Sequence, residues 1–361
     1  MWDLTADDVE RVAIGAAILG AGGGGNPLRG KLQALVHLQR GYQLRVVKFE
    51  ELADEALVVP LGGMGAPTIG LEKIGRGDEG KLAVEVLARH LGVQVAATVP
   101  IEVGGSNSFM PLIAAAQLGL PMVDADGMGR AFPELQMMSF YFDGTSPSPV
   151  VMVDCLHRVI TLEHIQPAGE VERLARAMCV QLGGRAMVAN EPIPVARLRR
   201  VCIPNTFELA HRIGDAVMTA HATGQNPVDA TCEVTGGRVL FRGKVVDVDR
   251  RIQRGYNFGS LRIDGLEAWH GATARIALQN EFLICRVDGD TVAVVPDLIT
   301  LVDSERGLPV TTELVRYGLR VDVLGLPAPR QLTTQQALQY VGPRAFGYDE
   351  EYQPLTSALR G

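Results

Sequence analysis

Residues 20–27 read Gly-Ala-Gly-Gly-Gly-Gly-Asn-Pro and join two stretches, 5–19 and about 28–39, whose apolar side chains recur every three or four positions. This spacing predicts two helices joined by a glycine-rich turn. Asn26 suits the N-cap of the second helix, and Pro27 suits its first helical position. Glycine lacks a Cβ atom, so such a backbone can turn with positive φ and approach a ligand closely. The turn is also consistent with a purely structural role, but it predicts one wall of a small-molecule site, built from Gly22, Gly23, Gly24, Gly25 and Asn26.

Helical and strand patterns alternate after this turn. Apolar strand candidates at 57–61, 93–99 and 121–123 are separated by helical patterns at 79–90 and 110–117. Repetition of strand, helix and strand is typical of an α/β layer with parallel strands. The first half of the chain is therefore predicted to be an α/β domain with a largely parallel sheet.

The second half of the chain has a different pattern. Helical patterns at 170–182 and 207–222 are followed, over about 232–310, by short β patterns separated by glycine-containing turns. Short β patterns separated by turns are typical of antiparallel β structure. We therefore predict an amino-terminal α/β domain over 1–167 and a carboxyl-terminal domain over 168–361 that contains a β-rich part.

The amino-acid composition limits the kinds of molecule that the chain is expected to bind. The chain has 361 residues, of which 47% are hydrophobic, and its net charge of −7 gives no basic footprint for nucleic acid. No stretch approaches the ~20 apolar residues of a membrane span, and the first residues lack the basic start of a signal peptide. We expect a cytoplasmic protein with a small-molecule substrate, with neither nucleic acid nor membrane as partner. Its apolar composition favours a homo-oligomer.

The five cysteines and seven histidines are scattered, without a CxxC, HxH or HxxxH pair. Zinc sites usually use such spacings. The sequence therefore requires no cofactor, although carboxylates remain able to hold a divalent metal.

Glycines and polar residues follow three of the predicted strands. In parallel α/β sheets, ligands bind beyond the carboxyl ends of the strands. We therefore expect these loops to meet beside the glycine turn. They are Gly62–Thr68 followed by Glu72 and Lys73, Glu102 followed by Gly104–Ser108, and Asp124–Arg130.

Asp124 and Asp126 are the first candidates for catalysis. They are two positions apart at a predicted strand end, so both side chains lie on one side if the strand continues. Two close carboxylates push their pKa values apart, which lets one act as a general base near neutral pH. We place Asp126 first in this role and Asp124 second. Alternatively, the pair holds a divalent cation, orients ligand N–H groups or belongs to an ordinary solvated turn.

Other polar residues have both functional and structural interpretations. Glu72 can relay a proton and Lys73 can stabilise an anion, or the two form a surface ion pair. Asn107 suits an amide-like ligand or the cap of the next helix. Arg130 suits a substrate carboxylate or one of the aspartates. Glu134 is able to bind the substrate, or it occupies the first turn of a helix, where a negative charge is favourable.

His270 is the histidine to test first. It lies in a polar and aromatic segment, Glu267–Gly271, which is followed by Asn280-Glu281. A single histidine at a turn is more often structural than catalytic.

Six motifs are spread over nearly the whole chain: Gly20–Pro27, Met64–Thr68 with Glu72-Lys73, Gly104–Asn107, Asp124–Glu134, Pro296–Ile299 and Gly342–Asp349. Through them the chain resembles the S-methyl thiohydantoin desulfurase-like family, which is associated with hydantoinase and oxoprolinase systems. The resemblance implies the two-domain fold described above. It also implies activity on a five-membered cyclic amide or amidine, and the named activity converts S-methyl thiohydantoin and water to a hydantoin and methanethiol.

The sequence leaves three functions open. The first is a hydrolase of a hydantoin or S-methyl thiohydantoin type of ring, in which a carboxylate base activates water. The second is a metal-dependent cyclic amidohydrolase that uses Asp124, Asp126, Glu134 or His270 as ligands. The third is a noncatalytic subunit that binds a ligand or a nucleotide beside a hydantoinase-like partner. Residues 20–27 lack the GK[ST] ending of a phosphate loop, which disfavours the nucleotide.

Overall fold

The computed structural model describes residues 1–355. Their first large sheet has nine strands in the order β1-β2-β5-β4-β3-β9-β7-β8, with β10 beside β3. The neighbouring strands β2, β5, β4 and β3 are parallel, and the remaining pairs are antiparallel. The bounds are β1 Trp2–Asp3, β2 Arg45–Val47, β3 Leu57–Gly65, β4 Ala97–Pro100, β5 Met122–Val123, β7 Val150–Val153, β8 Val159–Leu162, β9 Arg185–Ala189 and β10 Ile193–Pro194.

Ten α-helices accompany this sheet and its neighbour in the described part of the chain. The two helices expected around the glycine turn are confirmed: Thr5 caps α1 through Asp8, and Asn26 caps α2 ahead of Pro27. The bounds are α1 Ala6–Leu19, α2 Pro27–Gln39, α3 Ile69–Glu72, α4 Glu79–Leu91, α5 Met110–Leu118, α6 Ala168–Gln181, α7 Val195–Val201, α8 Thr206–Thr223, α9 Pro227–Thr235 and α10 Gln335–Val341.

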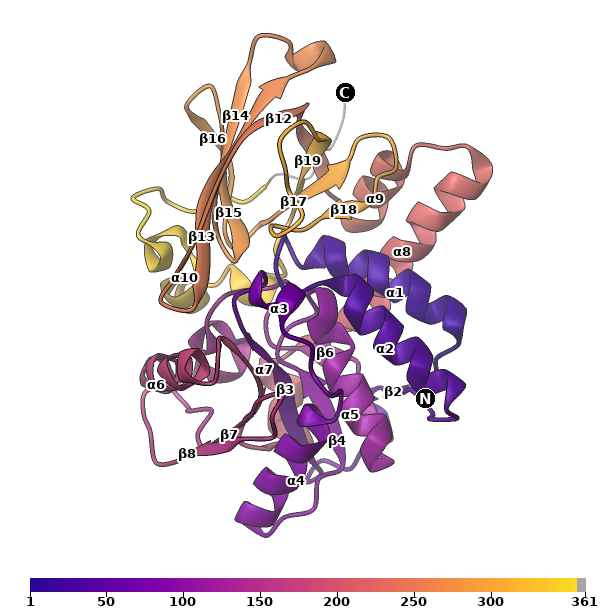
Figure 1. The fold of residues 1–361 in the computed structure, drawn as a ribbon, viewed down its shortest axis with the longest axis vertical. Coiled ribbons are helices and arrows are strands. Elements are labelled where there is room, and N and C mark those ends of the chain that lie inside the picture. Colours follow the sequence, from indigo (N-terminus) through magenta and orange to yellow (C-terminus); the bar gives the residue numbers. More distant parts are fainter. Residues whose placement is uncertain (356–361) are drawn as a thin grey trace.

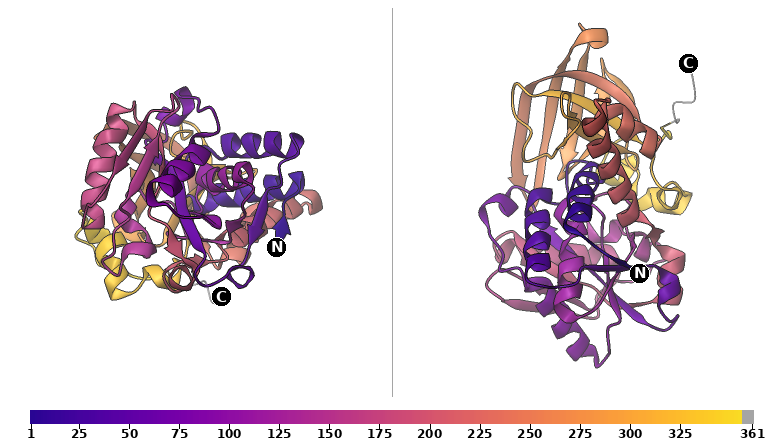
Figure 2. Two further views of the ribbon diagram at one scale, coloured as in Figure 1. Left: turned by 90° about the horizontal axis from the view of Figure 1, so that it is seen from below. Right: turned by 90° about the vertical axis from the view of Figure 1, so that its right-hand side faces the viewer.

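The second large sheet is antiparallel and has the order β16-β15-β14-β13-β12-β19-β17-β18. The predicted α/β class with a β-rich carboxyl-terminal part is therefore confirmed. Figure 1 shows this sheet above the α/β part, and the right-hand view of Figure 2 shows the same arrangement from the side. The bounds are β12 Arg238–Gln253, β13 Tyr256–Gly265, β14 Thr273–Gln279, β15 Glu281–Val287, β16 Asp290–Val294, β17 Leu298–Asp303, β18 Pro309–Val310 and β19 Arg320–Leu326.

Segments after residue 167 complete the α/β part. Strand β9 pairs with β3, and the short strand β11 (Ile203–Pro204) pairs with β6 (Ala125–Asp126). Helix α8 packs directly against α1, where a Cβ atom at Gly15 would lie 1.8 Å from the Ala210 carbonyl oxygen. The close contact of these helices therefore depends on glycine.

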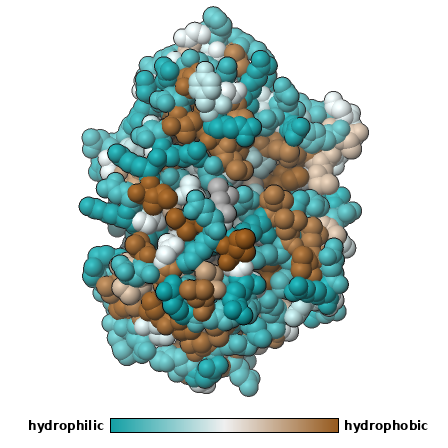
Figure 3. Space-filling view, viewed as in Figure 1, coloured by the Kyte–Doolittle hydropathy of each residue, from teal (hydrophilic) through white to brown (hydrophobic). Residues whose placement is uncertain are grey.

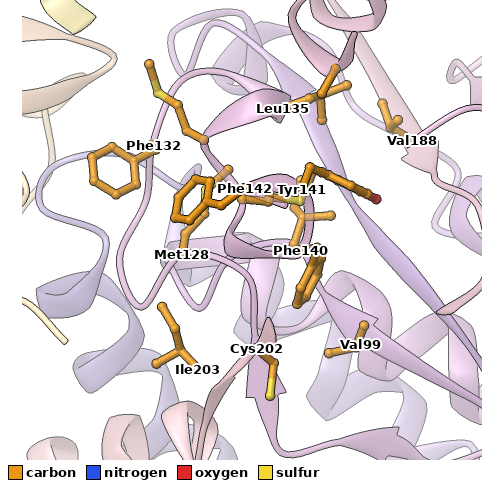
Figure 4. Close-up of a cluster of buried hydrophobic side chains, with 14 of the residues drawn as sticks. Val99, Met128, Phe132, Leu135, Phe140, Tyr141, Phe142, Val188, Cys202 and Ile203 are labelled. Atoms are coloured by element: carbon orange, nitrogen blue, oxygen red, sulfur yellow. The ribbon is translucent and has the colours of Figure 1, made fainter. Parts of the chain in front are cut away.

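A large hydrophobic cluster lies under the loops that follow β4 and β6. Met128, Phe132, Phe140 and Phe142 belong to it together with Val99 of β4, and Figure 4 shows these side chains gathered from several loops. Burial of such aromatic side chains is a major source of stability. The cluster thus fixes the loop that carries Arg130. Within residues 1–355, no helix is long and apolar enough to cross a membrane.

Candidate functional site

The glycine turn lies between the two large sheets. Gly22, Gly24 and Gly25 have φ values of 91°, 76° and 80°, which favour glycine. On the carboxyl-terminal side, the Phe282 N–H donates to the Ala21 carbonyl at 2.8 Å. The turn is therefore part of the contact between the α/β part and strand β15.

The other side of the turn is bound to the loop after β4. The Asn107 N–H donates to the Gly24 carbonyl at 3.2 Å, and the Ser106 N–H donates to the Gly25 carbonyl at 3.3 Å. Gly24 could not carry a side chain here, because its Cβ atom would lie 2.3 Å from the Gly104 carbonyl carbon. The sequence-based expectation that these two loops meet is confirmed.

A small cleft of about 70 Å³ opens where the glycine turn, the ends of β3 and β4 and the start of β15 meet. Its size favours a compact ligand such as a single ring. It contains Gly24, Gly25 and Asn107 of the predicted binding residues, together with Gly63, Met64, Gly65, Ala66, Pro67, Gly70, Glu102, Ser106, Phe132, Pro133, Arg176, Arg185, Asn280 and Glu281.

Glu102 is a buried carboxylate at the end of β4. Its Oε1 accepts a hydrogen bond of 2.6 Å from the Asn107 side chain, and its Oε2 accepts one of 3.1 Å from the Phe132 N–H. The Asn107 oxygen in turn accepts from the Gly63 N–H at 2.8 Å. Asn107 therefore positions Glu102 and also faces the cleft.

Glu281 enters the cleft from the other sheet, at the turn between β14 and β15. It is only 3% exposed, and its Oε2 has no hydrogen-bond partner within residues 1–355. Its Oε1 lies over Gly23, where a Cβ atom would be 2.0 Å away. Gly23 thus makes room for this carboxyl group and does not itself line the cleft.

Arg130 lies behind the two glutamates and is fully buried. Its guanidinium donates to the Asp297 carbonyl at 2.7 Å and to the Phe282 carbonyl at 3.0 Å, and it lies 4.7 Å from the centre of the Phe132 ring. The side chain therefore connects the two sheets instead of lining the cleft. It is not placed to bind a substrate carboxylate.

The pKa values of Glu102, Glu281 and Arg130 favour proton transfer in the cleft. Burial raises the pKa of Glu102 to about 8, and burial together with the nearby Glu102 raises the pKa of Glu281 well above its usual value. Burial lowers the pKa of Arg130 to about 10, so it stays charged at neutral pH. Hydrogen bonds from Asn107 and Phe132 favour the ionised form of Glu102, whereas Glu281 lacks such donors within the described residues. The pair therefore ionises first at Glu102, and Glu281 keeps its proton.

The Gly23→Ala variant is expected to displace the Glu281 carboxyl group from the cleft, because the added Cβ atom would lie 2.0 Å from its Oε1. Gly23 does not have positive φ, so the effect comes from contact with Glu281 and not from backbone strain. Gly169→Ala in α6 is the matched control, because its Cβ would meet nothing within 4 Å. The measurement is the position of the Glu281 carboxyl group in crystal structures of both variants. An unmoved carboxyl group in Gly23→Ala would contradict this role of Gly23.

The two aspartates predicted to be catalytic lie outside this cleft. Asp124 accepts from the Phe207 N–H at 2.9 Å and from the Lys48 ammonium at 2.7 Å, so it holds the start of α8. Asp126 accepts from the Val103 N–H at 2.7 Å and the Gly129 N–H at 2.9 Å. Burial raises the pKa of Asp126 to about 7, but backbone donors occupy its oxygens. Both carboxylates are placed to fix loops.

The remaining predicted residues also lie apart from the cleft. Glu72 is exposed, and the Lys73 ammonium donates to the Leu182 carbonyl at 2.5 Å. Asn26 caps α2, and His270 is exposed in the connection between β13 and β14. Glu134 follows the cleft residue Pro133 and interacts with Gln136.

The four side chains considered as cation ligands do not come together. Asp124 lies beside Lys48, Asp126 binds loop N–H groups, Glu134 lies near α6 and His270 lies on the other sheet. Among residues 1–355, no group of three or more His, Cys, Asp and Glu side chains has a metal-binding arrangement.

Sequence reasoning did not assign Glu102, Glu281, Arg176 or Arg185 to the site. Two of them had a local signal: Glu102 follows a predicted strand, and Glu281 belongs to a polar cluster after His270. Arg176 lies inside α6 and Arg185 at the start of β9, in segments without any functional motif. Only the tertiary fold brings these two cations to the cleft.

The fold and the cleft define a two-part protein in which a small cleft lies between an α/β layer and an antiparallel sheet. Models of the S-Me-THD-like N-terminal and C-terminal domains match residues 7–164 and 166–355, so the chain belongs to the S-Me-THD-like family. This confirms the resemblance to the S-methyl thiohydantoin desulfurase-like family.

Comparison with solved structures supports the fold alone. The chain is similar to a protein from Chromobacterium violaceum, known from an X-ray structural genomics target, with a TM-score of 0.81 and 22% sequence identity. The match covers 98% of this chain and 100% of that chain. A comparison with curated proteins gave no match.

Proposed function

We propose that this protein hydrolyses a small cyclic amide or amidine of the hydantoin or S-methyl thiohydantoin type, with Glu102 as general base and Glu281 as general acid. One observation carries the proposal: a buried Glu281 carboxyl without a hydrogen-bond partner at Oε2 lies in the same cleft as Glu102. A pair of carboxyl groups with raised pKa values in a cleft is typical of acid–base catalysis. Family membership supports this ring class.

The proposed reaction uses one water molecule. Glu102 takes a proton from water as the oxygen adds to the ring carbon that carries the sulfur, and Glu281 gives its proton to the ring nitrogen of the C=N bond. The C–S bond of the resulting tetrahedral species then breaks with both electrons on sulfur. The added hydroxyl loses its proton and becomes the hydantoin carbonyl, and the thiolate takes up this proton to give methanethiol. Glu102 then releases its proton to solvent and Glu281 takes one up, which restores both carboxyl groups.

The glycine turn supplies hydrogen-bond donors to this step. Gly24 and Gly25 line the cleft, and neither backbone N–H donates a hydrogen bond within the described part of the chain. Free N–H groups aimed at a site where charge develops stabilise an oxyanion or a carbonyl oxygen. These two N–H groups would bind a ring oxygen of the ligand.

The pH dependence of activity follows from the two glutamates. We expect kcat/KM to rise as the pH increases through about 8, because the base Glu102 ionises there. At still higher pH it should fall as Glu281, whose pKa is also raised, loses its proton. A pH–rate profile with buffer controls measures this. An ascending limb near the usual glutamate value of 4.5 would contradict the assignment of Glu102.

The stability of the fold should fall over the pH range in which kcat/KM rises. A carboxyl group whose pKa is raised in the folded state contributes stability that is fully present below its unfolded value and is lost as the pH rises through its folded value. For Glu102 this window runs from 4.5 to about 8. The free energy of unfolding should therefore decrease over this range, and Glu102→Gln should reduce the slope, as measured by denaturation at several pH values.

The function is tested by incubating the protein with hydantoins, thiohydantoins and their S-methyl derivatives. Free thiol should be measured in a protein-free filtrate, because Cys155 and Cys232 are partly exposed and react with thiol reagents. Release of thiol and hydantoin from the S-methyl compounds supports the proposal. Binding without turnover would instead favour a noncatalytic subunit, and metal-dependent turnover by protein with bound metal would favour the metal-dependent amidohydrolase.

We also propose self-association through α2. Leu28, Leu32 and Val36 form an exposed apolar row on this helix, with 54%, 51% and 40% of their surfaces exposed. Figure 3 shows apolar side chains gathered over α2. Light scattering should give a mass above the 38.8 kDa of one chain, and Leu32→Glu should lower it. A monomer would contradict this proposal, and a hydantoinase-like partner would then be the alternative occupant.

A further inference from the structure

A second, smaller pocket lies behind the cleft. Its volume is about 30 Å³, which is room for only a few heavy atoms. Arg185 is the one residue that lines both this pocket and the cleft. Arg185 therefore borders both spaces, and the pocket lies next to the cleft.

Arg185 has a guanidinium without a protein partner. It forms no hydrogen bond or ion pair through its side chain among residues 1–355. Burial, together with repulsion from Arg29, lowers the pKa of Arg185 to about 10, so the group is still charged at neutral pH. Glu79 lies close enough to act on this charge but forms no ion pair with it among residues 1–355. A partly buried cation without a hydrogen-bonded anion is costly, which favours an anionic ligand group beside it.

Two further cationic side chains, Arg29 and Lys73, add to the positive charge around this pocket. Arg29 donates to the Gly70 and Lys73 carbonyls at 2.7 and 2.9 Å, and Lys73 donates to the Leu182 carbonyl. These partners are uncharged. Glu79 is the one carboxylate that lines the pocket, and its oxygens accept backbone N–H groups of residues 76 and 77. The pocket is therefore positive.

Most of the other side chains around the pocket are apolar or contain sulfur. Met110, Met187 and Cys155 line the pocket, with Val153 and Ala186. Thioether and thiol groups are polarisable and adapt to sulfur-containing or apolar ligands. The combination of a positive charge with sulfur side chains suits a small, soft anion with an alkyl group.

We infer that this small pocket receives the alkylthiolate that leaves in the proposed reaction, with Arg185 stabilising the sulfur as it departs. The inference rests on the proposed function. As the C–S bond breaks, both of its electrons move to sulfur, and the Arg185 N–H groups donate hydrogen bonds to the developing thiolate. The proton released from the added hydroxyl balances the thiolate, so the products are the hydantoin carbonyl and a neutral thiol.

Pocket size gives a test that does not require turnover. S-methyl, S-ethyl and S-propyl thiohydantoins with the same ring substituent are titrated into the Glu281→Gln variant, which keeps the shape of the site. The dissociation constant should rise at least about tenfold from methyl to propyl, because a longer chain in this small pocket must push aside the side chains that line it. Adding Met187→Ala should remove this preference. Equal affinities in both backgrounds would overturn the inference.

The second test removes the positive charge of Arg185. Arg185→Met should lower kcat for S-methyl release by about 10²–10³-fold with little change in KM, because the interaction forms as charge develops. Arg185→Lys should recover part of this loss. Arg89→Met, an exposed residue at the end of α4, is the control. If Arg185→Met is no slower than this control, the inference fails. If size selectivity is seen but no compound is turned over, the pocket stands and the proposed hydrolysis fails.

Discussion

Glu281→Gln is expected to lower kcat/KM for hydrolysis of an S-methyl thiohydantoin by about 10²–10⁴-fold, the usual contribution of a positioned acid or base. Glu281 is 3% exposed, and burial raises its pKa well above the usual value, so glutamine matches the shape and the charge of its protonated form. The variant should therefore fold normally and bind the ring. What it loses is the proton that the ring nitrogen takes up.

Two variants serve as controls for this result. Glu267→Gln changes a carboxylate that is 67% exposed on the carboxyl-terminal sheet, and it should leave turnover unchanged. Asp126→Asn replaces an acceptor of the Val103 and Gly129 N–H groups, so it should lower stability while the folded protein keeps its activity. Loss of turnover in folded Asp126→Asn with full activity in Glu281→Gln would move the acid–base chemistry from the cleft to Asp126.

Arg130→Met is expected to lower the free energy of unfolding by about 3–5 kcal/mol, the usual cost of removing one member of a buried charge group. The substitution leaves the Phe282 and Asp297 carbonyls without their guanidinium donors. It also removes the cation that lies behind Glu102 and Glu281. The contact between the two sheets should therefore weaken.

Chemical denaturation measures this loss, and Arg173→Met is the matched control. Arg173 pairs with Glu170 on the surface of α6 and its side chain is 65% exposed, so its replacement should leave the free energy of unfolding close to that of the wild type. If Arg130→Met is as stable as this control, the guanidinium does not hold the two sheets together.

Local sequence patterns were sufficient for the fold class and for most helices. The caps at Thr5 and Asn26 and the glycine turn follow from residues only a few positions apart. The antiparallel pairing of β9 with β3 could not be predicted in this way, because it joins segments more than a hundred residues apart. The α/β layer consequently takes in residues from beyond the boundary expected at 167/168.

The candidate site depends still more on distant contacts. Asp124 and Asp126 have the pattern of catalytic residues, but their oxygens are occupied by N–H groups of Phe207 and Val103 that no local pattern reveals. Glu281 comes from the other sheet and meets Glu102 only after the two parts have packed together. Gly24 and Gly25 of the glycine turn line the cleft, and the role of the turn as a wall of a ligand site stays a prediction. Its Gly23 position also explains how Glu281 can approach.

The most direct test of the central claim is hydrolysis of an S-methyl thiohydantoin in water enriched in oxygen-18, with the wild type and Glu281→Gln compared at equal concentration. Mass spectrometry of the hydantoin should show one heavy oxygen per methanethiol released by the wild type, and about 10²–10⁴-fold less product from the variant. Equal rates for the two proteins, or methanethiol release without heavy oxygen in the ring carbonyl, would contradict carboxyl-assisted addition of water in this cleft.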